Sequence, residues 1–259
     1  MQSRAYWAKR IAEQQETLYG SSLYDTQKAL AIAYTNSLKA IEKDVKSLYD
    51  EILIDGVPDT TELYKFNRFM DLSKDLNKKL KTLGYKEIEI NSFNLMNLYN
   101  ATGKLIMKEA PLDFAAIVNN KAGKAAVDIV WCSDGKHWSD RIWSNKSGLQ
   151  SRIEKGLIDS VARGASKADL IKTLQADLNV GYYQSDRIAR TELNYIQNKA
   201  AADKYREAGV EKYRVLANQA DDDCADEDGE EYLLADAEVG FNYPPFHPNC
   251  RCTVIAVIE

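Results

Sequence analysis

The chain has 259 residues, of which 45% are hydrophobic and 28% are charged. This composition is ordinary for a globular protein of one or two domains. The apolar runs are much shorter than the roughly 18 residues that a membrane-spanning helix requires, so the sequence argues against an integral membrane protein. The first residues, MQSRAYWAKR, lack the apolar segment of a secretory signal. We therefore expect a protein that is made and kept in a cytosol.

The net charge of -5 is unevenly distributed along the chain. Residues 1–200 carry 29 basic and 25 acidic side chains, a balance of +4, whereas residues 201–259 carry 5 basic and 14 acidic side chains, a balance of -9. The acidic end argues against nucleic-acid binding there. The mildly basic remainder permits a DNA contact but does not require one.

The first half of the sequence is predicted to be helical. Between residues 22 and 53 there is no glycine or proline, and apolar residues recur every three or four positions, at Leu30, Tyr34, Leu38, Ile41, Val45, Leu48 and Ile52. This spacing predicts one long helix with a narrow apolar stripe. We favour packing in an intramolecular bundle over a dedicated oligomer zipper. The stripe is longer than a short bundle needs, so residues 1–110 are also our candidate docking region.

Further helices are expected at 4–19, 60–82, 87–108, 146–164, 166–178 and 183–208. The breaks between them are placed at glycines, which commonly interrupt helices: Gly56 before Pro58, Gly84, Gly164 and Gly181. Residues 111–145 predict only short helices and irregular structure. We divide the chain into a helical N-terminal region (1–110), a helical middle region (111–180) and a C-terminal domain (181–259).

The pattern changes after Gly209. Residues 212–217 and 253–258 are rich in residues that favour strands. We expect them to pair in a small, mainly antiparallel sheet that packs against the helix at 183–208. The predicted fold class is therefore α+β: a mainly helical N-terminal two-thirds, followed by a small sheet and a Cys/His loop. We expect the C-terminal domain to be self-contained.

The loop between these strands contains a candidate metal site. Its residues are Cys224, His247, Cys250 and Cys252. Pro244 and Pro245 precede His247, and Pro248 follows it. Thiolates and imidazoles are the ligands that zinc prefers in a tetrahedral site. A loop with many carboxylates and little apolar content cannot hold itself by burial, so a cross-link at its base is needed. We predict one structural zinc bound by these four residues.

Three other interpretations of the cluster remain open. A disulfide between Cys224 and either Cys250 or Cys252 is one, although a reducing cytosol disfavours it. A Pro/Cys turn without metal is another. A catalytic Cys–His pair is the third, but it needs an orienting group and a cleft that the sequence does not indicate.

The C-terminal region contains an ordered series of short motifs. These are Arg190–Thr191–Glu192, Gly209, the strand at 213–217, Cys224, Asp228–Gly229 and the run from Pro244 to Cys252. Over about residues 183–255 this order resembles the phage Mu F-like minor head proteins, also called head morphogenesis proteins. Members commonly have a second cysteine three residues after the first, where this chain has Glu227. We expect Glu227 to lie outside the metal shell.

The resemblance implies a structural role. Such proteins are minor components of the heads of tailed phages and prophages, associate with the portal protein, and act in head assembly, genome packaging or delivery. The implied location is the virion head, and the host cytoplasm during assembly. Capsid or scaffold proteins are further possible partners. Some relatives carry a toxin domain after the cysteine motif, which we do not expect here.

We expect no enzyme activity, since no phosphate-binding loop or glycine-rich nucleotide turn is present. Two alternatives are kept. One is a zinc-dependent DNA-processing or toxin-like enzyme that uses the Cys/His loop. The other is a DNA-binding ejection protein, which would require the basic residues of 1–200 to gather on one face.

Overall fold

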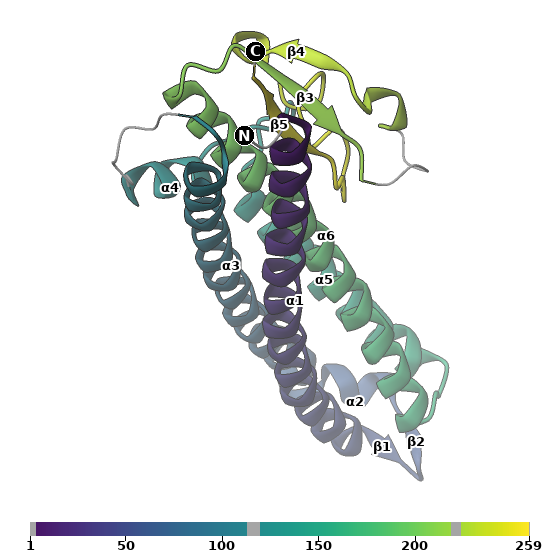
Figure 1. Cartoon of the computed structure of the whole chain (residues 1–259). Coiled ribbons are helices and arrows are strands. Elements are labelled where there is room, and N and C mark those ends of the chain that lie inside the picture. The colour runs from purple at the N-terminus through teal and green to yellow at the C-terminus, as the bar shows by residue number, and fades with distance from the viewer. Residues whose placement is uncertain (1–3, 113–119, 219–223, 259) are drawn as a thin grey trace. The chain divides into compact units, whose positions relative to one another are not determined.

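The computed structural model describes residues 4–112, 120–218 and 224–258 (Figure 1). Helices predominate and the strands are short, so the α+β prediction is confirmed. In chain order the elements are α1 (Arg4–Glu51), β1 (Leu53–Ile54), β2 (Val57–Pro58), α2 (Thr60–Tyr64), η1 (Lys65–Asn67), α3 (Arg68–Glu109), α4 (Asn120–Val127), α5 (Trp138–Ala162), α6 (Lys167–Glu207), β3 (Lys212–Leu216), η2 (Ala225–Glu227), β4 (Glu231–Leu233), η3 (Leu234–Asp236) and β5 (Thr253–Val257). Within these ranges, no helix has the length and apolar character that crossing a membrane demands.

The chain is organised in two compact units, each built from separated segments. The bundle unit comprises residues 28–90 and 139–186. The sheet unit comprises residues 1–27, 91–138 and 187–259, of which the described parts are considered below. Each unit has its own apolar core.

The apolar stripe of α1 is buried in the core of the bundle unit. Ile41, Val45 and Ile52 are almost completely buried, and they pack with leucines from the bundle segments of α3, α5 and α6. The interpretation as a bundle helix is therefore confirmed. Because this face is covered within the chain, the argument that the stripe is available for docking a partner is wrong.

Two of the glycines expected to end helices lie inside continuous ones. A Cβ atom on Gly84 would come within 2.5 Å of the Trp143 ring, so the missing side chain allows α5 to pack closely on α3. A Cβ atom on Gly181 would meet Leu149 at 3.0 Å and the Tyr34 ring at 3.3 Å. The predicted breaks at these two positions are therefore wrong. The glycines are retained for close helix packing, which outweighs their low helix propensity.

The bundle unit contains a network of buried polar side chains, one from each of its four long helices. Tyr34 (α1), Glu87 (α3), Lys146 (α5) and Ser185 (α6) form a connected network. The ammonium of Lys146 donates to the Tyr34 hydroxyl at 2.5 Å and pairs with the Glu87 carboxylate, which also accepts from Ser185 at 2.8 Å. The Lys146 and Glu87 side chains are 4% and 1% exposed. Burial lowers the pKa of Lys146 and raises that of Tyr34.

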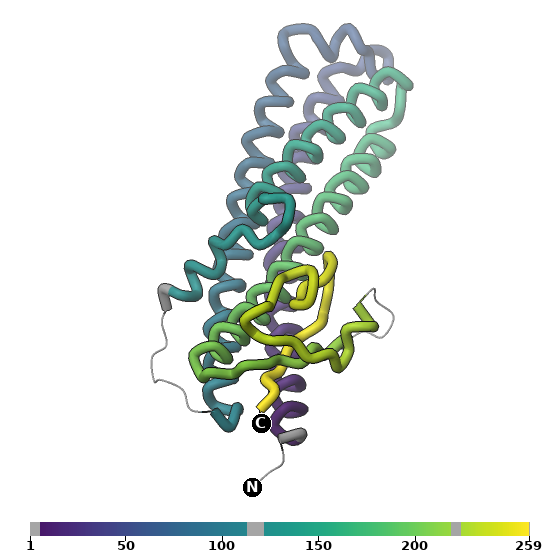
Figure 2. Tube along the Cα trace, turned by 90° about the horizontal axis from the view of Figure 1, so that it is seen from above, coloured from purple at the N-terminus to yellow at the C-terminus, as the bar shows by residue number. Residues whose placement is uncertain are grey.

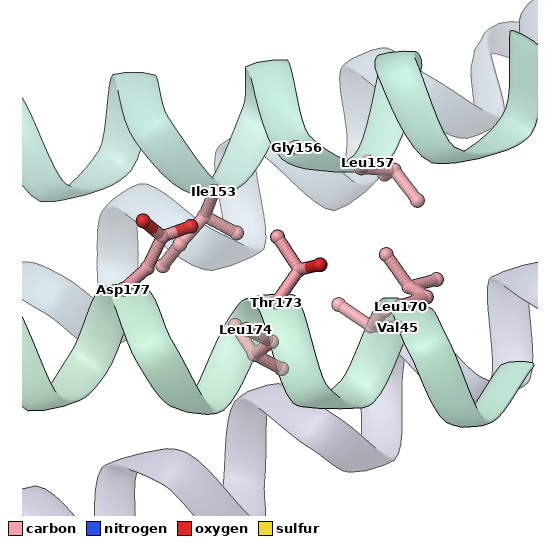
Figure 3. Close-up of a pocket in the computed structure, with 8 residues that line it drawn as sticks. All are labelled: Val45, Ile153, Gly156, Leu157, Leu170, Thr173, Leu174 and Asp177. Atoms are coloured by element: carbon pink, nitrogen blue, oxygen red, sulfur yellow. The ribbon is translucent and has the colours of Figure 1, made fainter. Parts of the chain in front are cut away.

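The bundle unit has a small cavity between two of its helices. Figure 3 shows the small cavity between α5 and α6, where Gly156 faces Thr173 and Val45 of α1 lies nearby. A Cβ atom on Gly156 would lie 3.2 Å from the Thr173 methyl group. The cavity measures about 10 Å³, which is at the lower limit for one water molecule. It is a packing defect and not a ligand site.

The sheet of the sheet unit has the strand order β4-β3-β5, and both pairings are antiparallel. In the β3–β5 register Tyr213 lies opposite Ala256, and Val215 lies opposite Val254. The sheet packs on α6 through Tyr205 and its neighbours. The predicted pairing of 212–217 with 253–258, and their packing on this helix, are therefore confirmed. The strand β4 was not expected.

The C-terminal region takes part of its core from the N-terminal region. Ile11 of α1 and Ile106 of α3 pack in the same cluster as Tyr213, Cys250 and Val254. The first turns of α1 lie beside the sheet in both Figure 1 and Figure 2. The expectation that the C-terminal domain is self-contained is corrected by these contacts.

Candidate metal centre

The fold brings three of the four predicted ligand residues together, and the fourth, Cys252, contacts one of them. Cys224 precedes η2, while His247, Cys250 and Cys252 lie in the segment that leads into β5. The ligand atoms of Cys224, His247 and Cys250 all lie within 4.8 Å of one another. The Sγ of Cys252 lies beside this set, 3.0 Å from the Sγ of Cys224. All three cysteines are buried, and none of them forms a disulfide with another.

The ring of His247 is oriented as a metal ligand requires. Its Nδ1 lies 2.9 Å from the carbonyl oxygen of Pro248. A carbonyl can only accept, so Nδ1 must carry the proton. The lone pair is then on Nε2, which faces the Cys224 sulfur at 3.4 Å. Ligating histidines generally donate their other ring nitrogen to a backbone carbonyl or carboxylate in this way.

The sulfur of Cys250 lies in surroundings that favour a thiolate. A hydrogen bond from Cys252 lowers the pKa of Cys250 to about 6, against the opposing effect of burial. Backbone hydrogen bonds involving Phe246 and Cys252 lower it further. The same interaction raises the pKa of Cys252, because its proton is held between the two sulfurs. Thiolate character at this position suits a metal ligand.

Polar side chains of α6 hold the ligand segment in place. The side-chain amides of Asn194 and Asn198 donate to the carbonyl oxygen of Cys252 at 2.9 and 3.0 Å. The hydroxyl of Thr191 accepts from the backbone of Asn249 at 3.0 Å. Asn249 has a positive φ of 65°, a conformation that asparagine tolerates better than most residues. We call Thr191, Asn194 and Asn198 the polar stripe of α6.

The polar stripe was missed in the sequence analysis, although a signal for it is present. Thr191, Asn194 and Asn198 are spaced three and four residues apart, so they share one face of the helix. The buried face of a helix is usually apolar, but on this face Asn194 and Asn198 are both buried. Buried amides are retained where they satisfy backbone groups that have no other partner.

A second buried contact joins α1 to the start of β5. The hydroxyl of Thr253 donates to the Gln15 side chain at 2.9 Å, and the Gln197 amide donates to the Gln15 backbone at 2.7 Å. At the surface, Arg251 pairs with Glu16 at 3.6 Å. These contacts tie the residues on either side of Cys252 to the first helix of the chain.

The charged residues near the site have structural partners. Glu192 accepts a hydrogen bond from the indole of Trp131 at 2.9 Å, and that indole stacks on Tyr195. Glu227 accepts from the Tyr232 hydroxyl at 2.8 Å. Glu227 is outside the three-residue set whose ligand atoms converge.

The donor set fits a structural zinc. Three thiols and an imidazole nitrogen match the preference of zinc for sulfur and nitrogen, and a tetrahedral zinc separates its sulfur ligands by about 3.8 Å. Cys224, His247 and Cys250 could hold a metal ion, and Cys252 would complete the predicted set of four. An ion bound in this way would cross-link the two ends of the acidic loop.

The comparison with known families accords with this geometry. Residues 151–255 match the family described as Phage Mu protein F like protein. Residues 151–255, about two fifths of the chain, are similar to this family, and we call them the Mu F-like region. The Mu F-like region includes all four predicted metal ligands, the polar stripe of α6 and the three-stranded sheet except for the last two residues of β5. The family therefore connects this region to phage head morphogenesis.

A curated relative resembles the whole chain more distantly. The chain is 22% identical over 281 residues to the NAD(+)--arginine ADP-ribosyltransferase EFV of Enterococcus faecalis (strain ATCC 700802 / V583). The match covers 98% of this chain but only 55% of the relative, so the chain spans about half of that protein's length. No solved structure matches the chain.

Proposed function

We propose that the protein is a minor head protein of a tailed phage or prophage, associated with the portal and acting in head assembly, genome packaging or delivery. The observation that carries the proposal is the Mu F-like match of residues 151–255. The built site supports the same conclusion, because its polar contacts serve to fix a loop and not to bind a small molecule.

Zinc is proposed as a structural component of the Mu F-like region. Support comes from the convergence of Cys224, His247 and Cys250, and from the protonated Nδ1 of His247. In this proposal the ion closes the acidic loop at its base. The loop carries surplus negative charge that destabilises a compact conformation, and a cross-link offsets that effect.

Head association is tested by particle composition. The tagged chain is expressed together with the portal, scaffold and capsid proteins of the same phage, and particles are separated on a density gradient. We expect the chain to co-sediment with particles that contain portal protein, and to be lost from particles assembled without portal. An equal amount in portal-free particles would contradict portal association, and absence from all particles would contradict the head-protein assignment.

Delivery is distinguished from assembly by the phenotype of particles that lack the chain. Particles that assemble and fill with DNA but fail to transfer it would favour the ejection alternative. Failure to assemble or fill favours a morphogenetic role.

The similarity to the arginine ADP-ribosyltransferase calls for a test of the expectation that this chain is not an enzyme. We infer that the half of that relative which this chain matches contains its Mu F-like portion, so that the two proteins share a head-associating module. The purified chain is then incubated with NAD and a small guanidine compound. We expect no transfer of ADP-ribose, with the E. faecalis enzyme as the positive control. Transfer that persists in independently purified preparations would establish the enzymatic alternative.

A further inference from the structure

One end of the bundle unit presents a cluster of exposed apolar side chains. This tip comprises residues 53–71, which include the β1–β2 hairpin, α2 and η1. Its large apolar side chains that face solvent are Phe66 (82% exposed), Val57 (57%), Met70 (54%), Tyr64 (53%), Ile54 (49%) and Leu53 (36%). A cluster of this kind on a globular protein generally marks an interaction site.

The backbone of the tip is shaped to present Phe66. Phe66 and Asn67 have positive φ values of 53° and 59°, a conformation that a bulky aromatic residue rarely adopts. The guanidinium of Arg68 lies 5.4 Å from the centre of the Phe66 ring, and Arg68 is itself paired with Glu62. An exposed aromatic ring held in this way loses little entropy on binding, so it is suited to act as an anchor.

The sheet unit contains a groove with complementary properties. It lies between α1 and α3 and measures about 350 Å³. Leu18, Ala101 and Leu105 supply its apolar surface, while Lys104 and Lys108 are the charged residues that line it. Both lysines are exposed. The volume is at the lower end of the range for sites that enclose a bulky group.

The charges of the two surfaces have opposite sign. The tip carries four acidic residues (Asp55, Asp59, Glu62 and Asp71) and two basic ones (Lys65 and Arg68), a balance of -2. The basic pair is engaged with Glu62. None of the residues that line the groove is acidic, and its two lysines give a balance of +2. Lys108 also pairs with the neighbouring Glu109 at 3.1 Å, so Lys104 carries most of the uncompensated charge. An apolar anchor with an acidic border therefore matches an apolar groove with a basic border.

We propose that the tip of one copy of this chain docks into the groove of a second copy, with Phe66 as the anchor. Each copy has both surfaces, so the contact is heterologous: it repeats from copy to copy and generates a closed ring or an open filament. The proposal does not depend on head association, because it concerns the purified chain alone.

The test compares two single-surface variants of the full chain. Phe66→Ser removes the anchor, and Lys104→Glu with Lys108→Glu reverses the charge of the groove. Wild-type protein is expected to associate with increasing concentration in analytical ultracentrifugation, and less at high ionic strength. Each variant should weaken self-association at least tenfold. The matched controls are Phe93→Ser, an exposed phenylalanine elsewhere on α3, and Lys78→Glu with Lys81→Glu.

Mixing the two variants gives the decisive result. The tip variant retains its groove and the groove variant retains its tip, so an equimolar mixture should form a one-to-one dimer and nothing larger. Circular dichroism and thermal unfolding verify that each variant folds. The proposal is overturned if the wild type stays monomeric at every soluble concentration, if the groove variant associates as the wild type does, or if the mixture does not pair. Association lost only in the tip variant would instead indicate a tip-to-tip contact and also overturns it.

Discussion

The side-chain amide of Asn194 donates to the backbone carbonyl of Cys252 at 2.9 Å, which attaches the helix α6 to the segment that contains the metal ligands. Replacement of Asn194 by alanine leaves that buried carbonyl with one hydrogen bond fewer. We expect the free energy of unfolding to fall by about 1–3 kcal/mol, measured by urea denaturation. Asn179→Ala, an exposed asparagine of the same helix, is the control for the change in helix propensity. Equal effects at both positions would show that the contact contributes nothing.

Loss of a ligand should remove the metal. Freshly purified reduced protein is expected to contain one zinc per chain, and Cys224→Ser or Cys250→Ser should abolish it, while Cys132→Ser, outside the cluster, should not. Under a chelator the sheet unit should loosen, because a structural metal contributes directly to folding free energy. The measurements are elemental analysis and near-ultraviolet circular dichroism. Zinc-free wild-type protein with unchanged stability would refute the metal site.

Addition of one methyl group should have opposite effects at two helical glycines. Gly84→Ala forces the Trp143 ring to move, since its Cβ would approach the ring to 2.5 Å, and we expect a loss of about 1–3 kcal/mol. Gly20→Ala meets nothing within 4 Å. It should stabilise the protein by about 0.5–1 kcal/mol through higher helix propensity. Thermal denaturation of the two variants provides the comparison, and stabilisation by Gly84→Ala would contradict the packing argument.

Stability should fall at alkaline pH because of buried tyrosines. Burial raises the pKa of Tyr243 well above its ordinary value of 10.0, and its hydroxyl donates to the Asn198 carbonyl at 2.6 Å. In the folded state this phenol stays protonated, whereas in the unfolded chain it ionises near pH 10. The stabilisation is therefore complete below pH 10 and is lost as the pH rises above it, by about 1.4 kcal/mol per pH unit for one proton.

Replacement of Tyr243 by phenylalanine should make the free energy of unfolding fall less steeply with pH above pH 10, by the equivalent of one proton. The replacement also lowers stability at neutral pH, because the hydrogen bond to Asn198 is lost. Tyr24, which is 64% exposed, supplies the control variant Tyr24→Phe. Urea denaturation at several pH values between about 9 and 11 measures the slope. A slope unchanged by Tyr243→Phe would contradict the assignment.

The sequence predicted those features that local patterns determine. The stripe from Leu30 to Ile52 identified a bundle helix, and the β-rich segments at the C-terminus identified two paired strands. Ser166, at which the helix expected at 166–178 begins, accepts a hydrogen bond from the Asp169 amide at 3.1 Å, as a residue at the start of a helix commonly does. In each case neighbouring residues along the chain carry the information.

The features that were missed depend on residues far apart in sequence. Gly84 could end a helix or could make room for a neighbouring side chain. The structure shows the second case, because Gly84 packs against Trp143, which lies 59 positions later and does not enter into the helix propensity of residues near Gly84. The same holds for Gln15, which accepts a hydrogen bond from Thr253 at the opposite end of the chain. The ligand residues were identifiable because cysteine, histidine and proline are scarce here and cluster together. The asparagines that position them are of common residue types and required the structure.

The buried network of Tyr34, Glu87, Lys146 and Ser185 bears on how the four helices find their alignment. A core of leucines alone tolerates sliding of one helix by a full turn, since one leucine then replaces another. A slide by one turn of α5 would instead move the Lys146 ammonium about 5.4 Å along the axis and away from the Glu87 carboxylate. Replacement of the pair by leucine and methionine is therefore expected to raise the melting temperature and to broaden the methyl resonances in nuclear magnetic resonance spectra, because several alignments then have similar energy.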